Sequence, residues 1–113
     1  MMDSFKVDDA AKFHLVQQVM PQLFDALASV SSDGDVCADD VIDFLSLCTA
    51  TLLDNDTYLT TPRHLRLGAQ TVAKHVERRT KELRAAQEGT GQSLLSLVLA
   101  LRGDTLTRAL TAH

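Results

Sequence analysis

The segment from Thr61 to Glu88 restricts the fold of this chain more than any other stretch, because it has the periodicity of one long amphipathic helix. Thr61 is a suitable N-cap, and Pro62 suits the first helical turn, where its missing N–H costs nothing. Gly89 predicts the end of the helix and Gly91 reinforces it. At 100° per residue, one face is apolar and consists of Leu65, Ala69, Val72, Val76 and Leu83. That face is predicted to pack on a core.

The opposite face of the same segment is basic. Between residues 62 and 88 there are seven Lys or Arg against three Glu, a net charge of +4. The cations that form a candidate partner-binding face are Arg63, Arg66, Lys74, Arg78 and Lys81. Such a face can bind an acidic protein surface or nucleic-acid phosphates, or it can simply be solvated.

Two further helices are predicted before this segment. The first runs from about Asp8 to Val30, with Pro21 on its polar side, where a proline bends a helix without shifting its apolar phase. A loop over residues 31–35 follows. The second helix is predicted to begin near Val36 and to be well buried, because its apolar positions cover a broad arc. Its candidate acidic face consists of Asp39, Asp40 and Asp43.

A fourth helix is predicted after Gly91, and it is apolar on two sides. Such a helix needs two neighbours, either within the chain or on a second subunit. The possible dimer face consists of Leu95, Leu99 and Leu106. Gly103 predicts a break, followed by a short fifth helix that ends at about Leu110.

These patterns together predict an all-α fold. The chain has 113 residues, four Phe, one Tyr and no Trp, so its core must be built from smaller aliphatic side chains, which favours helices over strands. No alternating strand pattern is present. We therefore predict a single helical domain over residues 1–113, a small four-helix bundle with a Pro-kinked first helix and a short C-terminal fifth helix.

The charge of the chain is divided between its halves. Residues 1–56 have eleven Asp and two Lys, a net charge of −9, whereas residues 57–113 have nine Lys or Arg and four acids, a net charge of +5. The two halves are expected to attract each other, either within one chain or between chains.

Several features favour a cytoplasmic location. The N-terminal residues include acids where a secretory signal has basic residues, and no run is long and apolar enough to cross a membrane. Cys37 and Cys48 are eleven residues apart, about 16 Å along a helix, which is too far for a bridge between them. Both are interpreted as buried thiols in a reducing compartment, with a cross-chain disulfide left open.

Motifs for metal binding or catalysis are weak. The loop over residues 29–40 resembles a calcium-binding EF-hand in its Asp33-Gly34 step, but Ser29 replaces the first carboxylate and Asp40 replaces the bidentate Glu. His64 and His75 are about 16 Å apart along the helix, too far to share a metal ion. No spacing joins a nucleophile to a base. We expect no enzymatic activity, no cofactor and no metal.

The sequence therefore favours a protein-interaction module, meaning an adaptor, an inhibitor or a regulatory subunit, that forms a homodimer or binds another protein. The alternative is a nucleic-acid-binding regulator that uses the basic face. The isoelectric point of about 5.4 is low for that class of protein, which makes it the second choice.

Overall fold

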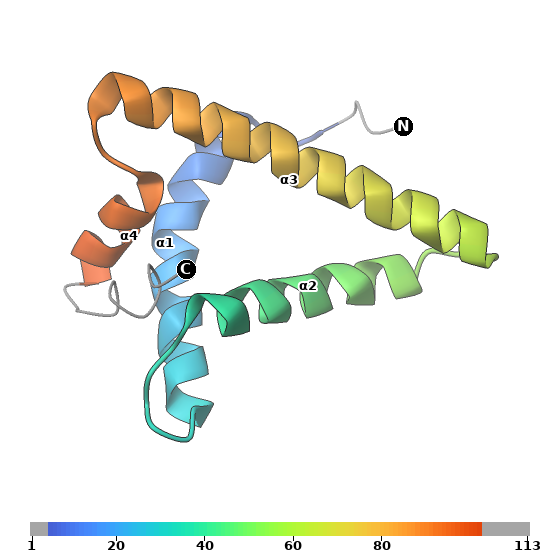
Figure 1. Ribbon diagram of the computed structural model, residues 1–113, viewed down its shortest axis with the longest axis horizontal. Helices are drawn as coiled ribbons and strands as arrows, with labels where there is room; N and C mark the ends of the chain where they lie inside the picture. Colours follow the sequence, from blue (N-terminus) through green and yellow to red (C-terminus); the bar gives the residue numbers. More distant parts are fainter. Residues whose placement is uncertain (1–4, 103–113) are drawn as a thin grey trace. The chain divides into compact units, whose positions relative to one another are not determined.

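The computed structural model describes residues 5–102, which form four α-helices and no strand (Figure 1). The helices are α1 (Asp9–Val30), α2 (Ala38–Asp54), α3 (Pro62–Thr90) and α4 (Leu94–Arg102). The predicted all-α class is confirmed. The short fifth helix, predicted up to Leu110, lies outside the described residues.

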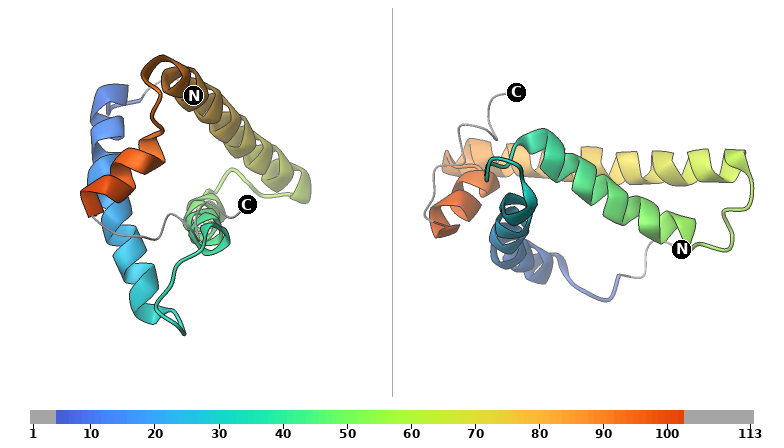
Figure 2. Two further views of the ribbon diagram at one scale, coloured as in Figure 1. Left: turned by 60° about the vertical axis from the view of Figure 1, so that its left-hand side comes forward. Right: turned by 90° about the horizontal axis from the view of Figure 1, so that it is seen from below.

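The described chain divides into two compact units, and the first contains α1 and α4. It consists of residues 5–38 and 94–102. The two helices lie side by side although they come from opposite ends of the sequence (Figure 2). The buried side chains of this unit are Phe24, Val36, Val98 and Leu99. Two apolar stripes distant in sequence thus form a small common core.

Helix α1 is one continuous helix that contains Pro21. Its N-cap is Asp8, as expected, and the carboxylate oxygen Oδ1 of Asp8 accepts a hydrogen bond of 2.8 Å from the backbone N–H of Ala11. This bond satisfies one of the backbone donors that a helix leaves unpaired at its start. The bend predicted at Pro21 remains a prediction.

The second unit, residues 39–93, is a hairpin of α2 and α3. The start of α3 agrees with its sequence signals: Thr61 is the N-cap, and its hydroxyl accepts a hydrogen bond of 3.1 Å from the backbone N–H of His64. The end of α3 differs from the prediction. The helix continues through Gly89 to Thr90, and Gly91 is the C-cap with a left-handed φ of 76°. Gly91 has the conformation that favours glycine at a helix end.

Helix α2 begins at Ala38, two residues after Val36 and close to its predicted start. The prediction that it is well buried is wrong, because Val41 is its one buried residue. The side chains of Ile42, Leu47 and Leu52 are all exposed. The physical reason is visible in Figure 1, where α2 and α3 approach each other at their connector and diverge away from it. A hairpin that opens in this way leaves much of the apolar arc of α2 uncovered within the unit.

Candidate functional site

The main surface feature of the α2–α3 hairpin is an apolar groove between its helices. The groove has a volume of about 450 Å³ and is lined by Ile42, Leu45, Ser46, Thr49, Ala50, Leu53, Ala69, Val72 and Val76. We call this set the α2–α3 groove. Seven of its nine residues are aliphatic, as is common in protein sites that bind apolar partners.

The two hydroxyl residues of the groove do not make it polar. The Ser46 hydroxyl donates to the backbone carbonyl of Ile42 at 2.8 Å, and the Thr49 hydroxyl donates to that of Leu45 at 3.0 Å. Each hydroxyl hydrogen is therefore bonded to a carbonyl of its own helix, so an apolar partner that covers it does not leave it without an acceptor. A partner can cover the groove without supplying hydrogen bonds to these donors.

The lining is far more exposed than a protein core. Ile42 is 62% exposed and Val76 59% exposed, on opposite walls of the groove. Together with Leu45, also exposed, they form a contiguous apolar surface. Contiguous patches of this kind on a folded chain mark contact sites more often than scattered apolar residues do.

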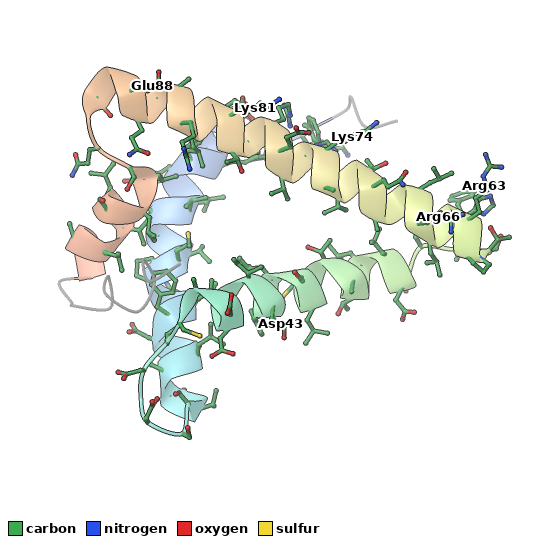
Figure 3. The ribbon with its side chains drawn as sticks, viewed as in Figure 1. Asp43, Arg63, Arg66, Lys74, Lys81 and Glu88 are labelled. Carbon is green, nitrogen blue, oxygen red and sulfur yellow. The ribbon has the colours of Figure 1, made fainter. Side chains whose placement is uncertain are left out.

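The predicted basic face is fully accessible on α3. Arg63, Arg66, Lys74, Arg78 and Lys81 are all exposed. Figure 3 shows Lys74 and Lys81 on the side of α3 that is turned away from α2, so the cations do not line the groove.

Part of the basic charge is compensated along the same helix. Lys81 Nζ lies 3.5 Å from Glu77 Oε2, one turn away. A further ion pair on α3, between Arg79 and Glu82 at 3.4 Å, does not involve the predicted face. Exposed pairs like these stabilise a helix by only about 0.3–0.5 kcal/mol. Among residues 5–102, Arg63, Arg66 and Lys74 form no ion pair, so they remain available to a partner.

The predicted acidic face on α2 is also exposed. Asp39 and Asp40 lie in the first turn of the helix, where a negative charge suits the positive end of the helix dipole. Asp43 is exposed one turn later. On a helical wheel, Asp39 and Asp43 come directly beside the groove residues Ser46 and Ala50. The groove therefore has an acidic border along α2.

The possible dimer face on α4 is less accessible than the groove. Leu99 is 3% exposed and Leu95 is half-buried, whereas Leu106 lies outside the described residues. Dimerisation through these leucines remains a prediction. The larger exposed apolar surface belongs to α2. The breadth of its apolar arc was visible in the sequence, but the sequence did not indicate what the arc packs against.

The acidic loop before α2 is an ordinary turn in its local bonding. Asp33 Oδ1 accepts hydrogen bonds from the Asp35 backbone N–H at 3.0 Å and from the Ser31 hydroxyl at 2.9 Å. The Asp35 N–H, and next the Ser31 hydroxyl, hold the pKa of Asp33 below its ordinary value of 3.8. Across the part of the chain that the structure describes, no three His, Cys, Asp or Glu side chains group so as to bind a metal ion.

Histidines and cysteines are dispersed in the described residues. His64 Nδ1 lies 3.5 Å from the Thr60 hydroxyl, and His75 Nδ1 lies 3.5 Å from Arg78. Cys37 and Cys48 form no disulfide. The prediction that both thiols are buried is wrong, because Cys37 is half-buried and Cys48 is exposed on the uncovered part of α2.

In residues 5–102, none of the helices combines the length and the apolar character that crossing a bilayer requires. No protein-family model matches the sequence, and the searches of curated proteins and of solved structures found no significant match.

Proposed function

We propose that this chain is a non-enzymatic protein-interaction module of the cytoplasm, an adaptor, inhibitor or regulatory subunit, and that it works as a homodimer. Its contact surface is the α2–α3 groove. One observation supports this proposal above the others: Ile42 and Val76 face a common groove and are each more than half exposed. Folding alone leaves this apolar surface exposed to water, and a bound partner can bury it.

The free energies of burial and of association favour a long partner over a short one. Fully burying a Val, Leu or Ile side chain stabilises by roughly 1.5–3 kcal/mol, so covering the exposed parts of Ile42, Leu45 and Val76 contributes roughly 1 kcal/mol each. Association costs roughly 4–15 kcal/mol in lost freedom of motion. Three side chains do not offset that cost, so the partner must run along the groove. A helical surface whose apolar face lies along both α2 and α3 meets this requirement.

The chain offers a matched pair of variants for a test. Ile42 and Leu47 are both on α2, both are aliphatic and each is 62% exposed, but only Ile42 lines the groove. We expect Ile42→Glu to lose partner proteins in affinity capture from native lysate, with quantification by mass spectrometry, because it places a carboxylate in an apolar contact. Leu47→Glu should retain them. Equal capture by both variants would place the contact elsewhere.

A second candidate function is nucleic-acid binding through the basic face. The observation that favours it is the exposure of Arg63, Arg66 and Lys74 without an ion pair among the described residues. This function predicts duplex binding that weakens steeply as salt rises and that is lost in Arg66→Glu/Lys74→Glu. Absence of binding to duplex DNA or RNA at low salt would exclude it.

A further inference from the structure

We propose that the occupant of the α2–α3 groove is the α2–α3 hairpin of a second copy of this chain. The two hairpins pack groove to groove about a two-fold axis and form a bundle of four helices, two from each protomer. This inference rests on the proposed function and deepens it, because it gives the arrangement of the helices in the homodimer.

The apolar surface is the first argument. A four-helix bundle needs an apolar stripe from each of its helices, all directed at one central axis. One hairpin supplies two such stripes, which include Ile42, Leu45 and Leu53 on α2 and Ala69, Val72 and Val76 on α3. A second copy supplies the missing two. An interface that is isologous in this way uses the same residues on both protomers.

The charges of the helices are the second argument, because they are self-complementary. Helix α2 has four Asp and no other charged residue, a net charge of −4. Helix α3 has seven Lys or Arg and three Glu, a net charge of +4. A second copy therefore presents charge of the opposite sign to each helix.

The same charges select one of two possible packings. In a square bundle, α2 of one protomer can lie beside α3 of its partner, so that negative and positive helices alternate around the square. The other packing puts α2 beside α2 and α3 beside α3, which places like charges together. Like-charge contacts across an interface disfavour a packing strongly, whereas opposite charges fix its register. The alternating arrangement is therefore the proposed one.

A variant with inverted charges tests this arrangement while it keeps the attraction inside each hairpin. Asp40→Lys, Asp43→Lys and Asp54→Lys change the charge of α2 from −4 to +2. Arg66→Glu, Lys74→Glu and Arg78→Glu change that of α3 from +4 to −2. All six residues are exposed, and the total charge of the chain is unchanged. Circular dichroism checks that the helix content equals that of the wild type.

Native mass spectrometry of each protein alone, and of an equal mixture after unfolding and refolding, then gives the result. We expect homodimers of each protein and a mixed dimer at least about twofold below random pairing, since in the mixed dimer each helix lies beside a partner helix of like net charge. Mixed dimers at the random proportion would overturn the proposal. So would a monomeric wild type, which would mean that the chain fills its own groove or binds a different protein.

Ile42→Glu provides a second measurement that does not depend on the inverted variant being folded. We expect it to be monomeric, with Leu47→Glu dimeric; a dimeric Ile42→Glu would overturn the groove as the self-contact. The two proposals fail in different ways. A monomer that captures another protein only when Ile42 is intact contradicts self-association, including the homodimer of the proposed function, but supports the interaction module. A chain that neither dimerises nor captures protein contradicts both.

Discussion

Gly68 of α3 lies directly against the side chain of Leu59 in the connector: a methyl group added at Gly68 would be 3.4 Å from Leu59 Cδ1. The same methyl group would lie 3.6 Å from Leu53 Cδ2 at the end of α2. Gly68, Leu59 and Leu53 thus bring α3, the connector and the end of α2 close together. The distances leave room for one carbon at ordinary van der Waals contact.

Substitutions at Gly68 should therefore have opposite effects according to size. Gly68→Ala should raise the free energy of unfolding by roughly 0.5–1 kcal/mol, because alanine favours the helix and the methyl fits. Gly68→Leu should lower it by roughly 1–3 kcal/mol, because a larger side chain at this position crowds Leu53 and Leu59. Urea denaturation followed by circular dichroism measures both values. A destabilised Gly68→Ala would show that the helices are closer than described.

The two glycines at the end of α3 make a second matched pair. Gly89 is inside the helix, whereas Gly91 is the left-handed C-cap, and an added methyl group meets no atom within 4 Å at either. Gly89→Ala should stabilise by roughly 0.5–1 kcal/mol through helix propensity. Gly91→Ala should destabilise by roughly 1–2 kcal/mol, because a left-handed conformation is strained for alanine. Thermal denaturation tests whether the two changes in stability have opposite signs. A stabilising Gly91→Ala would show that the C-cap of α3 is at another residue.

The pKa of Asp33 gives a prediction about pH. Because the folded-state pKa is lowered by the Asp35 N–H and the Ser31 hydroxyl, this carboxylate favours the folded state above pH 3.8, and its contribution is lost as pH falls through the lowered value. Ser31→Ala should move the pKa of Asp33 upward, but only part of the way, since the Asp35 bond is the larger cause.

Carboxyl carbon NMR titration measures this shift. Ser29→Ala is the control, because the Ser29 hydroxyl donates to the Ala26 carbonyl at 2.7 Å and not to Asp33. An equal pKa in the wild type and in Ser31→Ala would contradict the bonding described for the turn.

The exposure of α2 predicts unequal thiol reactivity. Cys48 is exposed and Cys37 half-buried, so the single-cysteine variant Cys37→Ser should react with an aromatic disulfide reagent faster than Cys48→Ser does. Both variants should react alike in denaturant. Faster reaction of Cys37 in the folded protein would contradict the assignment of α2 as the uncovered helix.

Local signals in the sequence were sufficient to predict the start of α3. Thr61 and Pro62 act through bonds and torsions within one turn, so their effect does not depend on the rest of the fold. The end of α3 was harder to predict because positions 89 and 91 are both glycine. Only the backbone angle at Gly91 distinguishes the cap from a glycine that remains inside the helix.

At the candidate site, the sequence predicted the apolar faces but not what packs against them. Periodicity indicated that Leu45, Val72 and Val76 belong to apolar faces, and these residues do line the groove. It did not indicate which element covers them. A stripe of apolar residues has the same period whether its partner is in the chain or on another molecule, so the burial expected for α2 was wrong while its apolar arc was identified correctly.

Light scattering, which gives the solution mass, tests directly whether the α2–α3 groove is the contact between two copies of this chain. We predict that the wild type and Leu47→Glu both have twice the 12.3 kDa mass of one chain, and that Ile42→Glu has the mass of one. A single-chain mass for the wild type, or the same doubled mass for all three proteins, would contradict dimerisation through the groove.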